Sequence, residues 1–182
     1  MLTGLENEIR ELIRNDSPRF HKLVRTRIGK RATLVVENRL KEVILLMPTL
    51  LKRVRFHWDR QEDCEAKSLG SFVFAYVFNP DDFLSEKEMG LFGYLDDAYL
   101  IASVFERVSQ NSHHRTKEDE RYLKLIQATK KYVRAVIPVH SQLIDEMIAE
   151  SIDSGTYTGF ANALGRNAWV TAISSHRTEK AI

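Results

Sequence analysis

Apolar residues recur every three or four positions along most of this chain, and that spacing constrains its fold more than any other feature. A period of about 3.6 residues gathers side chains on one face of an α-helix. The breaks between apolar stripes contain Pro, Gly, Asn, Asp or Ser, which begin and end helices. The sequence therefore predicts an all-α fold: a single compact domain of about eight or nine helices over residues 1–175, followed by a loose tail at 176–182.

Three of the expected helices begin with a recognisable capping pair. Thr3, Ser85 and Thr116 are each followed three residues later by an acidic residue: Glu6, Glu88 and Asp119. In that spacing the first side chain accepts a hydrogen bond from a backbone N–H in the first helical turn, and the acidic residue can return one. All three positions are therefore predicted to be helix N-termini.

Other boundaries are predicted from proline and from the distribution of apolar residues. Pro48 is expected to end one helix and to open a short one that ends near Trp58. Residues 62–78 become apolar on every side and are predicted to form the most buried helix. A last helix is expected to contain Phe160, Leu164, Trp169 and Ile173.

The sequence also favours a reducing compartment. Cys64 is the only cysteine, which excludes an internal disulfide and the zinc sites built from paired cysteines. The start of the chain lacks the basic and apolar regions of a signal peptide. The most apolar run, Leu69 to Phe78, is much shorter than the roughly 20 residues that a membrane span needs. We therefore expect a cytoplasmic protein with no membrane span.

Charge is distributed unevenly although the net charge is only +2. Residues 19–60 contain 12 Lys/Arg and 3 Asp/Glu, whereas residues 61–110 contain 3 Lys/Arg and 10 Asp/Glu. Such asymmetry can mark an interaction face for an acidic partner. It is equally compatible with basic and acidic helices that pack side by side and neutralise each other.

The basic stretch supplies the candidate binding residues. Arg25, Arg31, Arg53 and Arg55 are predicted to provide charge at a docking surface for another protein, with Trp58 as its apolar anchor. The same residues could follow a phosphate backbone while Trp58 stacks on a base. No recognised DNA- or RNA-binding motif accompanies them, so nucleic acid is the second choice.

Signatures of catalysis are sparse. The chain has no glycine-rich nucleotide loop and no Gly-x-Ser-x-Gly element. Arg107 and His113 have the Arg-x5-His spacing that resembles the signature of the helical HEPN ribonucleases, but composition alone produces about as many such spacings as the chain contains. Neither a catalytic residue nor a cofactor is assigned from the sequence.

Two pairs of aspartates are the remaining candidates for a chemical site. Asp81 and Asp82 follow a helix break, and Asp96 and Asp97 lie in the next expected helix, about 100° apart around its axis. Hard cations such as Mg²⁺ bind carboxylate oxygens, so Asp81, Asp82 and Asp97 are weak metal candidates. The alternative is that these carboxylates only cap helices and hold the loop between them.

The residues around these aspartates resemble the YkvA-like family, a small bacterial helical domain of unknown function. Tyr76, Pro80 and Asp81 match its Tyr-x-x-x-Pro-Asp element, and residues 93–97 match its Gly-Tyr-Leu-Asp-Asp element. The second Pro-Asp of the family pattern is replaced here by Leu84-Ser85-Glu86. The resemblance covers residues 66–108 and implies a helical hairpin; it brings no known activity.

Together these observations predict a non-catalytic accessory or adaptor protein that binds another macromolecule as a subunit of a bacterial multi-protein system. One alternative is a helical protein that binds nucleic acid or processes RNA. The other is a metal-dependent hydrolase that uses the aspartate pairs.

Overall fold

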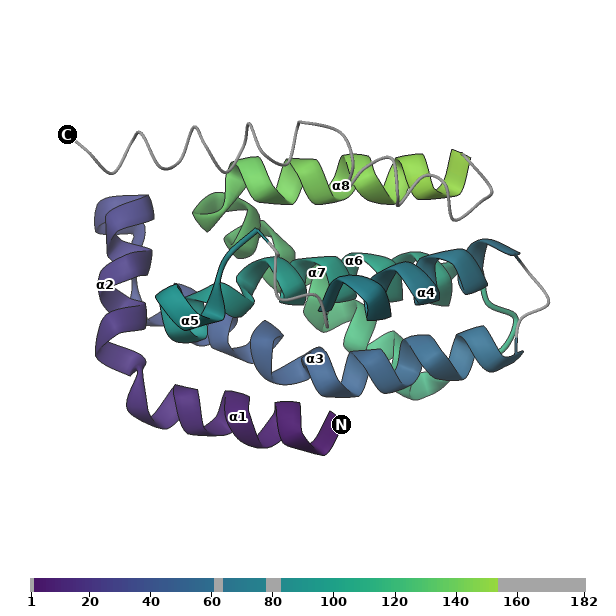
Figure 1. The fold of residues 1–182 in the computed structure, drawn as a ribbon, viewed down its shortest axis with the longest axis horizontal. Coiled ribbons are helices and arrows are strands. Elements are labelled where there is room, and N and C mark those ends of the chain that lie inside the picture. The colour runs from purple at the N-terminus through teal and green to yellow at the C-terminus, as the bar shows by residue number, and fades with distance from the viewer. Residues whose placement is uncertain (1, 61–63, 78–82, 154–182) are drawn as a thin grey trace.

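The computed structural model describes residues 2–60, 64–77 and 83–153 (Figure 1). These residues form helices and connecting turns with no strand, which confirms the all-α fold class. Seven helices have twelve residues or more: α1 (Leu2–Asn15), α2 (Ser17–Ile28), α3 (Leu34–Arg60), α4 (Cys64–Val77), α6 (Leu95–Gln110), α7 (Lys117–Val136) and α8 (Pro138–Asp153). Three short elements join them: the 3₁₀ turns η1 (Gly29–Arg31) and η2 (Gly90–Tyr94) and the single-turn helix α5 (Glu86–Met89).

The count of eight or nine helices stays a prediction. The expected helix containing Phe160, Leu164, Trp169 and Ile173 lies outside the described residues, as do the boundary at 175 and the tail at 176–182.

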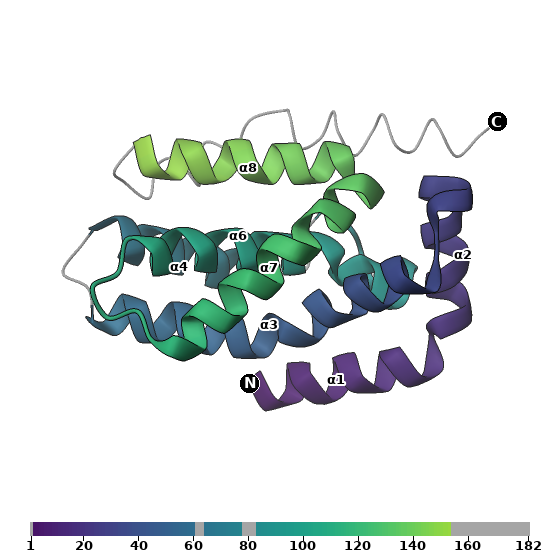
Figure 2. The same ribbon diagram turned by 180° about the vertical axis from the view of Figure 1, so that it is seen from behind.

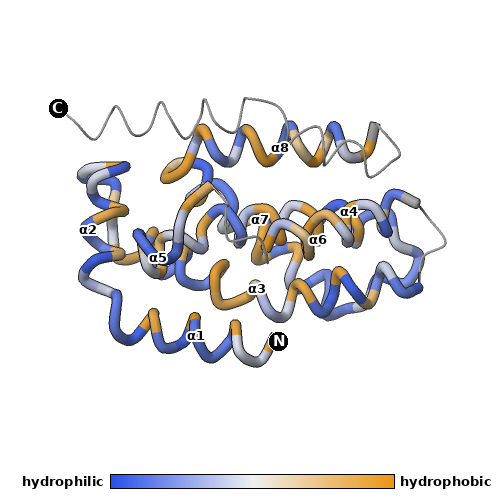
Figure 3. Tube along the Cα trace, viewed as in Figure 1, coloured by the Kyte–Doolittle hydropathy of each residue, from blue (hydrophilic) through white to orange (hydrophobic). Residues whose placement is uncertain are grey.

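Helix α6 is the centre of the fold. It contacts α3, α4, α7 and α8 (Figure 1). Thirteen of its sixteen residues are buried. Helix α1 lies along α3 on one side, and α2 stands across one end of the bundle (Figure 2). Apolar residues are frequent along α4, α6 and α8, whereas α1 and α2 are largely hydrophilic with narrow apolar stripes (Figure 3).

The prediction that residues 62–78 form the most buried helix was wrong. Within α4, the helix in question, Lys67 and Ala75 are exposed and several other side chains are only half buried. Helix α6 is surrounded instead, because four other helices pack on it. A hydropathy profile does not show that α6 is central, because the helix contains small residues and four buried polar side chains. The four polar residues are Asp96, Asp97, Ser103 and Ser109.

The break predicted at Pro48 was also wrong, because α3 continues through it from Leu34 to Arg60. A proline inside a helix loses one backbone hydrogen bond and crowds the preceding turn, at a cost of about 3 kcal/mol. Apolar side chains on both sides of Pro48 are buried, and their packing offsets that cost. They are Val43, Ile44 and Met47 before it, and Leu50, Leu51 and Val54 after it.

Two of the three predicted capping pairs occupy helix N-termini, whereas Thr3 does not cap α1, because that helix already begins at Leu2. Ser85 Oγ accepts a hydrogen bond from the Glu88 backbone N–H at 3.3 Å at the start of α5. Thr116 Oγ accepts from the Asp119 N–H at 3.2 Å, and the Asp119 carboxylate accepts from the Thr116 N–H at 2.8 Å. The second pair begins α7 and also contributes to the buried ion pair described below.

The η2 segment brings backbone close to backbone at Gly93. A Cβ atom built there would lie 2.6 Å from the Cα atom of Glu86. Ordinary side-chain movement cannot relieve this overlap, because the neighbouring atom belongs to the main chain. The close approach of α5 to η2 therefore requires glycine at this position.

Gly93→Ala is expected to lower the free energy of unfolding by about 1–3 kcal/mol through overpacking. Gly4→Ala is the matched control, since nothing lies within 4 Å of its added Cβ and it belongs to α1. The control is expected to be neutral or to stabilise by up to about 1 kcal/mol. Urea unfolding of both variants measures the difference; equal stabilities would contradict the prediction.

Candidate functional site

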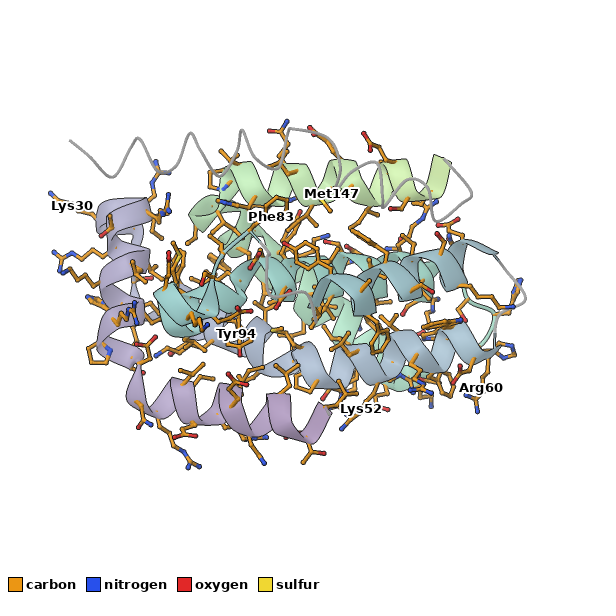
Figure 4. The ribbon with its side chains drawn as sticks, in the orientation of Figure 1. Lys30, Lys52, Arg60, Phe83, Tyr94 and Met147 are labelled. Carbon is orange, nitrogen blue, oxygen red and sulfur yellow. The ribbon has the colours of Figure 1, made fainter. Side chains whose placement is uncertain are left out.

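A strongly basic surface lies where α2 turns into α3. Residues 19–36 contain six Lys/Arg and no Asp/Glu. All six are exposed, and no carboxylate of the described residues forms an ion pair with any of them. Four of the six lie in the last turn of α2 and in η1: Arg25, Arg27, Lys30 and Arg31. Figure 4 shows Lys30 directed outward at the end of the molecule formed by α2.

Two apolar side chains are exposed beside these cations. Leu34 is 72% and Val35 62% exposed, the highest values among the large hydrophobic residues of the described chain. They lie in the first turn of α3 and follow Arg31 by three and four residues. We call these two residues together with Arg25, Arg27, Lys30 and Arg31 the basic corner.

The remaining predicted binding residues lie elsewhere, so the single docking surface expected from the sequence is divided. Arg55 and Trp58 belong to the last turns of α3, whereas Arg31 ends η1, three residues before α3 begins. At a rise of 1.5 Å per residue, Leu34 and Arg55 are about 32 Å apart along the axis of α3. In Figure 4, Lys30 and Arg60 mark opposite ends of the molecule.

Arginine and aromatic side chains occupy two sides of the far end of α3: Arg53, Phe56 and Arg60 lie on one side, and Arg55 and Trp58 lie about half a turn away around the helix axis. The Arg60 guanidinium carbon is 3.8 Å from the centre of the Phe56 ring, and that of Arg53 is 4.2 Å from it. Arg55 is 70% exposed and lies 3.8 Å from Asp59. Trp58 is half buried and packs against Gly70 and Phe74 of α4. We call Arg53, Arg55, Phe56, Trp58 and Arg60 the α3-end cluster.

An ion pair inside the molecule holds the Arg53 side chain in position. Its Nε and Nη2 atoms donate to the two carboxylate oxygens of Asp119 at 2.7 and 2.6 Å, and Nη2 also donates to Thr116 Oγ at 3.1 Å. Its side chain is 15% exposed. Because these donors are engaged, Arg53 holds the α3-end cluster in place, and its direct contact with a partner stays a prediction.

Asp119 is fully buried among these donors. Burial alone would raise the pKa of its carboxyl, but the hydrogen bonds from Arg53 and Thr116 outweigh burial and lower the pKa to about 2. His57 lies beside it, with Nε2 3.4 Å from Asp119 Oδ2 and Nδ1 3.0 Å from Ser112 Oγ. Burial lowers the pKa of His57. The group joins α3 to the start of α7 inside the molecule and gives no access to a substrate.

The second aspartate pair lies in the first turn of α6 and is buried. Asp96 Oδ2 accepts hydrogen bonds from the Tyr76 hydroxyl at 3.0 Å and from the Leu84 backbone N–H at 3.2 Å. No described donor lies within hydrogen-bonding distance of Asp96 Oδ1. Burial raises the pKa of Asp96 to about 7. This carboxyl group therefore fastens α4 and the segment before α5 to the central helix.

The metal site proposed from the sequence stays a prediction. Asp81 and Asp82 lie outside the described residues, and Asp97 is buried in the first turn of α6. Across residues 2–60, 64–77 and 83–153, no group of three or more His, Cys, Asp or Glu side chains could hold a metal ion.

Arg107 and His113 are not brought together by a shared contact. Arg107 donates from Nε to Glu65 at 2.6 Å, and His113 is exposed in the loop after α6. A ribonuclease function of these residues stays a prediction.

No helix in the described part of the chain combines the length and apolar character needed to cross a membrane. Comparison of the chain with protein-family models, with curated proteins and with solved structures gives no match in any of the three. The resemblance to the YkvA-like family therefore remains a prediction from residues 66–108.

Proposed function

We propose that this chain is a non-catalytic accessory protein that binds another protein through the α3-end cluster, as a subunit of a bacterial multi-protein system. The observation that carries the proposal is the stack of Arg53, Phe56 and Arg60 at the end of α3. Arginine and large aromatic side chains are the residues that most often dominate binding energy at protein interfaces. The bacterial assignment depends on the family resemblance.

The cluster is held in shape before any partner binds. Asp119 accepts hydrogen bonds from two of the three guanidinium nitrogens of Arg53, Arg53 lies on Phe56, and Trp58 packs on α4. Binding at a preorganised surface costs less conformational entropy than binding at one whose long side chains must first be ordered. Arg55 and Arg60 remain exposed at its rim and favour a partner surface that carries carboxylates.

Three titratable groups with shifted pKa values are enclosed by the fold. Asp96, Asp119 and His57 are all buried, and the contacts described above join one helix to another. A catalytic group needs to reach its substrate within hydrogen-bonding distance, directly or through a water molecule. These three side chains act on the stability of the fold.

Charge reversal at the cluster tests this function. The tagged protein, the R55E/R60E variant and an R121E/K124E control with the same charge change on exposed positions of α7 are purified from the native cells. We expect a stoichiometric partner protein with the wild type and the control, and a loss of recovery of about tenfold or more with R55E/R60E. Equal recovery with all three, at matched thermal stability, would contradict the proposal.

A further inference from the structure

The basic corner carries an exposed apolar pair that the protein-binding function does not use. Leu34 and Val35 precede the buried stripe of α3, which includes Leu40, Val43 and Ile44. They are adjacent in sequence and lie in a first helical turn, where backbone N–H groups point outward. Thr33 Oγ accepts from the Val36 N–H at 3.4 Å, and the positive end of the helix dipole lies at the same place.

The charges around this pair have one sign. Arg25, Arg27, Lys30 and Arg31 precede it, and none forms an ion pair with a described carboxylate. The first acidic residue after them is Glu37. It is 5% exposed, and its Oε1 atom lies 2.6 Å from His21 Nδ1, so its carboxylate is turned inward. The basic corner therefore has exposed cations and exposed apolar side chains, and residues 19–37 include no exposed carboxylate.

The combination of cations and exposed aliphatic side chains favours some anionic partners over others. A phosphate backbone would use the cations but offers little to aliphatic side chains, because bases are bound by aromatic stacking and polar contacts. The surface of an anionic bilayer uses both: headgroup phosphates bind the cations, and the acyl boundary accepts apolar side chains inserted to a shallow depth. Neither attraction alone gives firm membrane binding, and the corner supplies the two together.

We propose that the basic corner binds the surface of anionic lipid membranes, with Leu34 and Val35 inserted among the lipids and the four cations on the headgroups. The contact is peripheral and involves only the turn from α2 into α3. This inference does not depend on the function proposed for the α3-end cluster, which lies at the opposite end of α3.

Vesicle sedimentation of the full chain tests this inference at about 0.1 M salt, where charges further than about 10 Å apart are screened. The vesicles are phosphatidylcholine alone, or phosphatidylcholine with about one third phosphatidylglycerol. We expect binding to the anionic vesicles only. L34S/V35S should lower that affinity about tenfold, because less apolar surface enters the bilayer.

Neutralising two of the cations tests the electrostatic part. R25Q/R31Q should lower the affinity about 25-fold, at roughly fivefold per cation. Two matched controls should leave binding unchanged: L45S, which alters the other exposed large hydrophobic residue of α3, and R121Q/K124Q, which removes two exposed cations from α7. Thermal unfolding of every variant separates a lost contact from a lost fold.

Three results would overturn the inference. The first is equal sedimentation with neutral and anionic vesicles. The second is vesicle binding that L34S/V35S does not change. The third is tight binding of a single-stranded oligonucleotide that depends on Arg25 and Arg31 but not on Leu34 and Val35, which would identify a nucleic-acid surface. The partner capture described above uses Arg55 and Arg60, so each proposal can fail while the other holds.

Discussion

Replacing Asp119 by Ala is expected to lower the free energy of unfolding by about 3–5 kcal/mol, the usual effect of removing one member of a buried ion pair. The carboxylate is fully buried and accepts two hydrogen bonds from Arg53 and two from Thr116. Without it, the Arg53 guanidinium remains largely buried with no opposite charge, and the first turn of α7 loses its cap. Urea unfolding at neutral pH measures the loss.

Two variants make this prediction specific. Glu120 lies in the same helix as Asp119, and its exposed carboxylate is 3.9 Å from Arg115, which precedes that helix. Glu120→Ala should change the free energy of unfolding by less than about 0.5 kcal/mol. R53M/D119L replaces the pair by apolar side chains of similar size and should recover much of the stability that Asp119→Ala loses. A loss below about 1 kcal/mol for Asp119→Ala would show that the pair contributes little.

The pH dependence of the Asp119 contribution has a definite sign. The pKa of this carboxyl is lowered to about 2 in the folded protein and is about 3.9 in an unfolded chain. Its stabilising effect is therefore complete above about pH 4 and is lost as the pH falls through about 2.

Asp96 should make the protein less stable as the pH rises, the opposite of the usual behaviour of a carboxylate. Burial raises its pKa to about 7. In the unfolded chain the group ionises near pH 3.9, so between about pH 4 and 7 the unfolded state releases a proton that the folded state retains. At 1.36 kcal/mol per pH unit, this difference lowers the free energy of unfolding by about 4 kcal/mol across that range.

Asp96→Asn isolates this effect. Asparagine can still accept the hydrogen bonds from Tyr76 and Leu84 but does not ionise. The variant is expected to lose about 4 kcal/mol less than the wild type between pH 4 and pH 8, whatever its absolute stability. Urea unfolding at several pH values measures both slopes. Parallel pH profiles for the two proteins would show that Asp96 does not carry the raised pKa.

Much of the fold could be predicted because its signals are local. The apolar period of 3.6 residues and the caps at Ser85 and Thr116 depend on neighbours within one helical turn, and the structure has helices where they indicate. Pro48 and α6 could not be predicted in this way. Burial on both sides of Pro48 outweighs its local preference, and only tertiary packing shows that the helix with two aspartates is central.

The binding surface was predicted as one because the basic residues are close together in sequence. The continuous α3 separates them in space, with Arg31 near one end and Arg55 near the other. Counting charges along the sequence identified the basic stretch. It could not show that Arg53 forms an ion pair with Asp119, which lies 66 residues further along the chain. The sequence contained only a weak indication that Leu34 and Val35 are exposed: both fall outside the apolar stripe of the helix that they begin.

The continuous helix α3 sets the distance between the two ends of the molecule. Its 27 residues continue through Pro48 and span about 40 Å, and α1, α6 and α7 pack along it. Anything attached near Leu34 and anything attached near Arg60 would be held at a constant separation rather than on a flexible tether. Such a spacer fixes the distance and orientation of one attachment relative to the other. Shortening α3 by one full turn would move the attachments closer by about 5.4 Å with almost no change in their relative rotation.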